Sequence, residues 1–181
     1  MKEGLATILV AVLAAVALAA AAGQVKVKPV VTDDGRVLAS FTAADAWTTE
    51  TREFLQAGQV VTYSYSVELR RPSLWLDPLL ARTSVDASAK HDTLTGAYQV
   101  SRLRDGRVVR VENKAQESEI RDWLTIFEGI ELEPESPLQA NTDYYVQVRL
   151  SIAPRRNVSL WSVLPFGGSD SSGRQSFTYI R

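Results

Sequence analysis

The chain has 181 residues, the usual length of one domain, with a formal net charge of −1, 45% hydrophobic residues and no cysteine. Without cysteine the chain can form no disulfide, thiol nucleophile, iron–sulfur cluster or cysteine-ligated zinc site. His91 is the single histidine, so one chain cannot build a histidine metal cluster. The near-neutral charge argues against nucleic-acid binding. We therefore expect no cofactor, no metal site and no nucleic-acid partner.

An uncharged segment near the N-terminus has the composition of an export signal. Residues 5–22 consist of Leu, Ile, Val and Ala with one Thr, and they end in small residues. This pattern predicts that residues 1–22 are a signal peptide, cleaved near Ala22 or Gly23. The alternative is an uncleaved helical anchor in the inner membrane, because about 20 apolar residues span a bilayer. In both cases we expect residues 24–181 to lie in the periplasm.

Alternation of apolar and polar residues predicts strands along most of the remaining chain. The clearest pattern places Val61, Tyr63, Tyr65, Val67 and Leu69 on one face of a strand and polar residues on the other. One face of this strand is therefore expected to be packed and the other solvated. The further predicted strands lie around residues 25–31, 37–41, 81–90, 98–100, 109–111, 144–152 and 176–180.

Two short connecting helices are predicted between these strands. The first covers residues 48–57, where a threonine can cap the start and Gly58 can end the helix. The second covers residues 116–128, where apolar side chains recur at helical spacing. Together these elements predict one mostly β domain at residues 24–181, an antiparallel β-sandwich that is Ig-like in general architecture.

Two loops contain apolar residues where polar turns are expected. The first covers residues 72–80 and the second residues 154–173. If their tips lie at one end of the sandwich, they form an apolar patch that suits an envelope protein or a membrane surface. The alternative is that Trp75 and Trp161 pack back onto the body as satellite cores. The candidate contact residues are apolar anchors with an arginine rim: Trp75, Leu76, Trp161, Leu164, Phe166, Arg70, Arg71, Arg155 and Arg156.

Residues that could carry catalysis are few. His91 and Asp92 are adjacent, but neighbours in sequence rarely form a catalytic pair, and a hairpin turn follows them. The Gly- and Ser-rich segment at residues 167–173 lacks the lysine of a phosphate-binding loop. No catalytic residue is therefore predicted.

Four motifs stand out along the chain. They are Ala46-Trp47-Thr48, Tyr63-x-Tyr65-x-Val67-Glu68-Leu69-Arg70-Arg71, Asp92-x-Leu94-Thr95-x-x-Tyr98-x-Val100 and Trp161-x-x-Leu164-Pro165. Together they resemble the bacterial domain-of-unknown-function family 4390, over about residues 25–181. The resemblance implies a small exported or membrane-anchored bacterial protein, and it supplies no catalytic residues.

The favoured hypothesis is a non-enzymatic, exported interaction module that works through its apolar loops. One alternative is a periplasmic carrier of a small molecule or lipid, held between sheets lined by Tyr63, Tyr65, Tyr98 and Tyr144. The other is an enzyme that depends on His91. Fold class alone does not choose among them.

Overall fold

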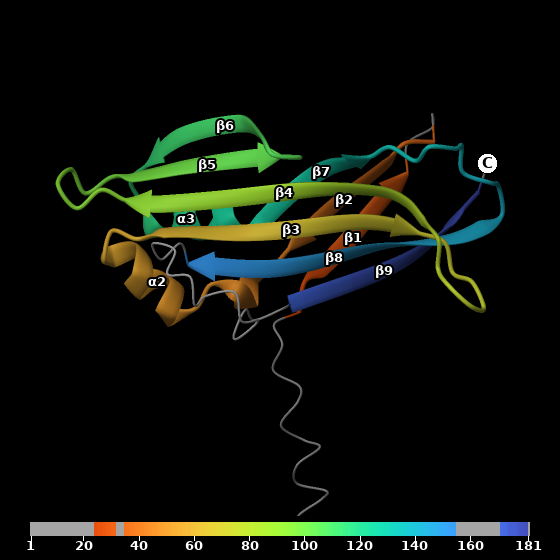
Figure 1. Ribbon diagram of the computed structural model, residues 1–181, viewed down its shortest axis with the longest axis horizontal. Coiled ribbons are helices and arrows are strands. Elements are labelled where there is room, and N and C mark those ends of the chain that lie inside the picture. Colours follow the sequence, from red (N-terminus) through yellow and green to blue (C-terminus); the bar gives the residue numbers. More distant parts are fainter. Residues whose placement is uncertain (1–23, 32–34, 155–170, 181) are drawn as a thin grey trace, which may run out of the picture.

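The computed structural model describes residues 24–31, 35–154 and 171–180, which form two facing β-sheets with two short α-helices (Figure 1). This confirms the predicted mostly β fold. The predicted N-terminal signal or anchor lies outside the described residues. The elements are β1 (Lys26–Val31), β2 (Val37–Thr42), the 3-10 helix η1 (Ala44–Ala46), α2 (Thr49–Gln56), β3 (Val60–Arg70), β4 (Leu79–His91), β5 (Tyr98–Arg104), β6 (Arg107–Lys114), α3 (Glu117–Thr125), β7 (Ile126–Leu132), β8 (Thr142–Pro154) and β9 (Ser171–Tyr179).

The larger sheet is antiparallel and has the strand order β6-β5-β4-β3-β8-β9. Its central strand is β3, which pairs with β4 on one side and β8 on the other. Tyr65, for example, lies between Val85 and Leu150, and all three side chains are buried. The predicted alternation of β3 is confirmed, because its apolar face packs into the core between the sheets.

The smaller sheet has the order β1-β2-β7. The predicted extension of the second helix to residue 128 is wrong, because α3 ends at Thr125 and β7 follows directly. The aromatic ring of Phe127 packs against Phe41 and Tyr65, each with ring centroids 4.9 Å apart. These contacts and the pairing of β7 with β2 favour an extended backbone over another helical turn.

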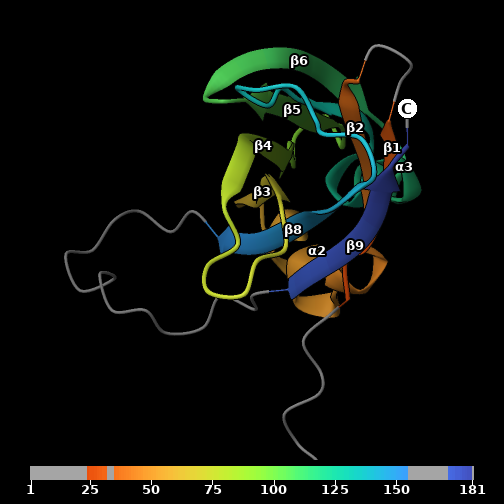
Figure 2. The ribbon, with the colours of Figure 1, turned by 90° about the vertical axis from the view of Figure 1, so that its right-hand side faces the viewer.

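The two sheets are joined along both sides (Figure 2). On one side β1 lies beside β9: Gln24 forms a parallel bridge with Ser172, and the Val25 amide donates to the Ser172 carbonyl at 3.4 Å. On the other side two arginines of β5 reach across. Arg102 donates to the carbonyls of Trp123 and Ile126 at 2.7 and 2.8 Å, and Arg104 donates to that of Glu131 at 2.7 Å.

Candidate functional site

The loop between β3 and β4, residues 71–78, presents three consecutive apolar side chains to solvent. Leu74, Trp75 and Leu76 are 97, 95 and 80% exposed. The loop projects beyond the ends of the two strands that it joins (Figure 1). We call these three side chains the apolar tip. Contiguous exposed apolar side chains of this kind are typical of a contact surface.

The base of this loop is fixed by Asp77. Its Oδ1 accepts the Ser73 amide at 2.8 Å, and its Oδ2 accepts the Tyr145 hydroxyl at 2.7 Å. The Arg70 guanidinium donates to the Asp77 carbonyl at 2.9 Å. Hydrogen bonds from Tyr145 and Ser73 hold the pKa of Asp77 below its usual range, so the carboxylate accepts both bonds at neutral pH. The apolar tip therefore stands on a turn that is already ordered.

A buried carboxylate lies beside this loop on the solvated face of the larger sheet. Glu68 is only 1% exposed because three guanidinium groups cover it. Arg70 and Arg82 each donate to it at 2.7 Å, and Arg149 donates at 3.3 Å. Burial alone would raise the pKa of Glu68, but the hydrogen bonds from Arg70 and Arg82 and the charge of Arg149 outweigh burial and lower it.

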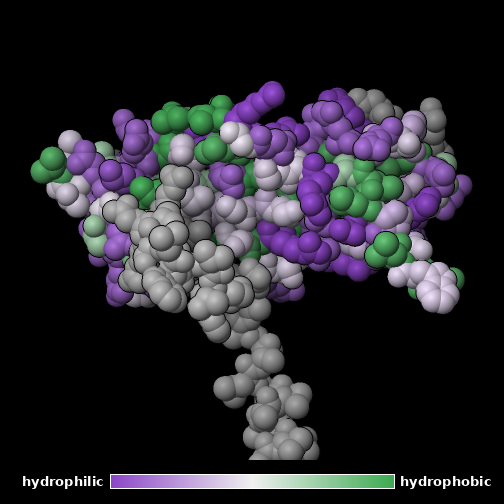
Figure 3. All heavy atoms as spheres, in the orientation of Figure 1, coloured by the Kyte–Doolittle hydropathy of each residue, from purple (hydrophilic) through white to green (hydrophobic). Residues whose placement is uncertain are grey.

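Four arginine side chains lie close together beside the loop base. Three of these arginines, Arg70, Arg82 and Arg149, contact Glu68. The fourth, Arg174, lies over the Tyr145 ring, with its Cζ 3.4 Å from the ring centroid. In the described part of the chain, these contacts gather four guanidinium groups around the carboxylates of Glu68 and Asp77. Figure 3 shows a band of hydrophilic residues that crosses this face and reaches the loop at the right. We call Arg70, Arg82, Arg149 and Arg174 the arginine cluster.

The predicted contact residues fall into three groups. Trp75 and Leu76 are exposed as the contact hypothesis requires. Arg70 is not a solvated rim residue, because it is engaged by Glu68 and Asp77, whereas the half-buried Arg71 reaches the Gln139 side chain at 3.4 Å. The remaining candidates lie outside the described residues: Arg155, Arg156, Trp161, Leu164 and Phe166.

The two apolar loops leave the sheet from opposite ends of β3. The 71–78 loop follows Arg70, which pairs with Tyr145, whereas β8 ends at Pro154, which pairs with Val61. The loop bases therefore do not support one combined patch. The contact role predicted for Arg155, Arg156, Trp161, Leu164 and Phe166 stays a prediction, because these residues lie outside the described part of the chain.

Three of the four tyrosines expected to line a carrier cavity belong to the packed core. Tyr63, Tyr65 and Tyr144 are at most 2% exposed. Their hydroxyls are hydrogen-bonded to the Ala46 carbonyl at 2.5 Å, the Leu124 carbonyl at 2.7 Å and the Gln139 amide at 2.8 Å, respectively. Burial raises the pKa of Tyr63 to about 12 and raises that of Tyr65 further. Such side chains fill the space between the sheets and do not favour a ligand there.

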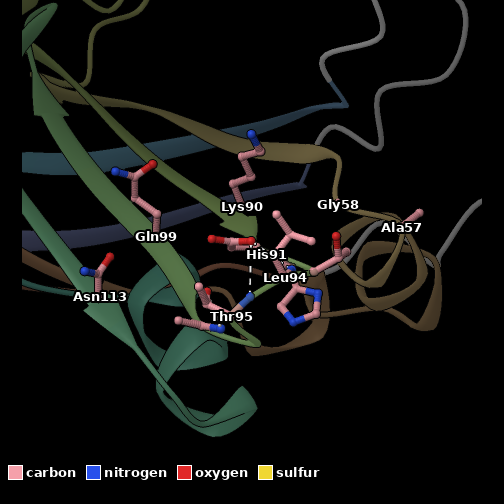
Figure 4. A pocket seen from close by; sticks show the side chains of 11 residues that line it. Ala57, Gly58, Lys90, His91, Leu94, Thr95, Gln99 and Asn113 are labelled. Carbon is pink, nitrogen blue, oxygen red and sulfur yellow. Dashed lines mark hydrogen bonds between the residues drawn. The ribbon is translucent and has the colours of Figure 1, made fainter.

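The hairpin turn beside His91 forms a shallow hollow with the end of α2 (Figure 4). The carboxylate of Asp92 accepts the amides of Leu94 and Thr95 at 2.9 and 3.4 Å, so it shapes the turn. The His91 ring packs against Tyr98 with the ring planes tilted by 31° and the centroids 4.5 Å apart, and its buried Nδ1 has no hydrogen-bond partner among the described residues. His91 and Asp92 therefore do not form an acid–base pair here.

The described part of the chain lacks two other kinds of feature. Within residues 24–31, 35–154 and 171–180, no group of three or more His, Asp or Glu side chains is placed to hold a metal ion. In the same part of the chain, no helix combines the length and apolar character needed to cross a membrane.

Replacing Trp75 with serine is expected to change the free energy of unfolding by less than about 0.5 kcal/mol, because substitutions of exposed side chains are nearly neutral. Trp123 is only 6% exposed, so Trp123→Ser serves as the matched control and is expected to cost at least about 3 kcal/mol. Urea unfolding of both variants measures the difference. A loss of several kcal/mol for Trp75→Ser would place this side chain in a core.

Comparison with known proteins identifies the family of the chain. The family model described as "Domain of unknown function (DUF4390)" matches residues 20–161, so the chain belongs to this family. No curated protein and no solved structure matches the chain. The family description assigns no activity, so the functional argument rests on the geometry of the site.

Proposed function

We propose that the protein is a non-enzymatic contact module of the bacterial cell envelope, and that the 71–78 loop is its contact element. The observation that carries this proposal is the exposure of the apolar tip, 97, 95 and 80% for Leu74, Trp75 and Leu76. Burying one such side chain in a contact is favourable by about 2 kcal/mol. The tip therefore has a strong tendency to be covered.

The fixed base of the loop supports the same proposal. A flexible loop loses conformational entropy when it binds, and this loss weakens the contact. Asp77 already ties the turn to Ser73 and Tyr145 before any contact forms. The ordering cost of the turn on binding is therefore small, and the turn presents Trp75 as an aromatic anchor of the type that dominates binding energy.

The proposed location follows from the composition of the N-terminus. Residues 5–22 are uncharged and apolar, as in an export signal or a membrane anchor. Either alternative delivers the β domain to the periplasmic side of the inner membrane. The partner of the apolar tip is then an envelope protein or the membrane surface itself.

Photo-crosslinking in living cells tests this function. A photoreactive amino acid replaces Trp75 in the full chain, and a matched control carries it in place of Leu94, which is also 95% exposed but lies in the turn at the far end of β4. We expect a discrete adduct, identified by mass spectrometry, at position 75 and none at position 94. A stable protein that forms no adduct at position 75 would contradict the proposal.

A further inference from the structure

We infer that the surface bound by the 71–78 loop is an anionic membrane, with the apolar tip among the lipid headgroups and the arginine cluster against lipid phosphates. This inference rests on the proposed function, because it requires the loop to be the contact element. It adds the chemical class of the partner.

The apolar tip has the composition of a membrane-interface anchor. Tryptophan favours the boundary between headgroups and acyl chains, where its ring is apolar and its N–H stays hydrated. Trp75 is flanked by Leu74 and Leu76, which can enter the boundary beside it, and all three are at least 80% exposed. A rigid turn with this tip can insert without refolding.

The arginine cluster offers phosphate-binding donors next to the tip. Each guanidinium has five N–H donors in a planar fork that matches phosphate oxygens. Arg82 reaches Glu68 through one nitrogen, and Arg149 uses its two terminal nitrogens for Glu68 and Gln147. Their side chains remain 54 and 52% exposed, so donors are left facing solvent. Glu68 holds the guanidiniums together, which reduces their repulsion before a phosphate arrives.

The tip and the cluster belong to one rigid unit. Arg70 donates both to Glu68 in the cluster and to the carbonyl of Asp77 at the loop base. Tyr145 donates to the Asp77 carboxylate and carries Arg174 on its ring. One flat surface can therefore contact the apolar tip and the positive charges together, and an anionic bilayer presents the complementary charge.

The chain also enters the β domain beside this unit. Gln24, the first described residue, bridges Ser172, and Ser172 pairs with Arg149 of the arginine cluster. Figures 1 and 2 both show the start of β1 and the 71–78 loop on the lower side of the molecule. Residues 5–22 precede this point, so a membrane segment there, the anchor alternative, would hold the tip and the cluster toward the same bilayer.

Fluorescence on vesicles tests the inference with the full chain. The sequence has no cysteine, so Leu74→Cys gives a single site for the environment-sensitive NBD dye and keeps Trp75 in place. Leu94→Cys, also almost fully exposed, provides the control label. The vesicles contain phosphatidylcholine alone or equal parts of phosphatidylcholine and phosphatidylglycerol, each with or without brominated acyl chains.

We expect the emission of the label at position 74 to shift to the blue, and to be quenched by brominated lipid, on the anionic vesicles and much less on the neutral ones. The label at position 94 should respond equally weakly to both. Equal responses at position 74 on neutral and anionic vesicles would overturn the inference, as would no response on either.

Arginine variants distinguish the effect of the arginine cluster on membrane binding from the effect of the total charge of the protein. Arg149→Gln combined with Arg174→Gln is expected to weaken binding to the anionic vesicles about thirtyfold, because two basic contacts are lost. Arg107→Gln combined with Arg121→Gln removes the same charge from exposed positions on β6 and α3 and should have a clearly smaller effect. Equal effects of the two pairs would contradict a role for the cluster.

The vesicle and cell experiments fail in distinguishable ways. If crosslinking at position 75 yields one discrete protein while the label at position 74 ignores anionic vesicles, the contact function stands and the membrane inference falls. If neither experiment responds, both fall. Lipid adducts in cells together with quenching on anionic vesicles support both.

Discussion

Replacing Gly173 with alanine is expected to destabilise the protein by about 3 kcal/mol, the upper part of the range for overpacking a tight site. Gly173 lies in β9, where the backbone of Val25 crosses it. An added Cβ would lie 1.8 Å from the Val25 carbonyl oxygen and 2.7 Å from its carbonyl carbon. Backbone atoms cannot rotate away, so β1 must move off β9.

This substitution tests the junction between the two sheets. Ser176→Ala, at an exposed position on the same strand, is the control and should stay within about 0.5 kcal/mol of the wild type. Urea unfolding gives both values. A cost below about 1 kcal/mol for Gly173→Ala would mean that β1 does not pack on β9 as described.

Replacing Glu68 with alanine is expected to cost about 3 kcal/mol at neutral pH, near the lower end for breaking a buried ion pair. The carboxylate is 1% exposed and has three arginine partners, but Arg82 and Arg149 are themselves half exposed and can be rehydrated. Their exposure limits the loss. Glu117→Ala, which removes an ion pair between two exposed side chains, is the control and should cost less than about 1 kcal/mol.

The effect of Glu68→Ala should depend on pH. The pKa of Glu68 is lowered in the folded state, so its contribution to stability is fully present above its unfolded pKa of about 4.3. That contribution is lost as the pH falls through the lower folded value. Unfolding at neutral and acidic pH should therefore give a stability difference that shrinks in acid. A difference that is constant with pH would show that Glu68 acts through packing and not through charge.

Local sequence patterns predict the strands and the first helix well, because alternation along a strand and a capping side chain involve only residues close together in the sequence. The two-residue period of β3 separates its packed face from its solvated face, as the burial of Tyr63 and Tyr65 confirms. The first helix is predicted at residues 48–57 and observed at Thr49–Gln56. The hydroxyl of Thr48 accepts the Thr51 amide at 3.2 Å, which is the expected cap.

Other features depend on partners that are distant in the sequence. The helical spacing of apolar residues continues through Phe127, yet this residue belongs to β7, where its ring packs against Phe41 and Tyr65. Glu68 meets Arg82 only through the register of β3 with β4, and Arg149 reaches it from β8. The alternation of β3 places Glu68 on the outer face of the strand, and this much can be predicted from the sequence. Its arginine partners can be predicted only when the order of the strands in the sheet is known.

The exposure of the apolar tip could not be predicted from composition. Two prolines and five large apolar residues in the 72–80 segment fit a satellite core as well as a projecting turn. The structure favours the projecting turn, because Asp77 closes the loop below Trp75. The conformation of this loop therefore depends on Tyr145, which is far away in the sequence.

The most direct test of the contact function is the yield of photo-crosslinking at position 75 relative to position 94 in living cells. Both side chains are 95% exposed in the protein alone, so any difference in yield reports a partner and not accessibility. The contact function predicts a discrete adduct at position 75 that is absent at position 94. Equal yields at the two positions, with the protein stable in the cell, would contradict it.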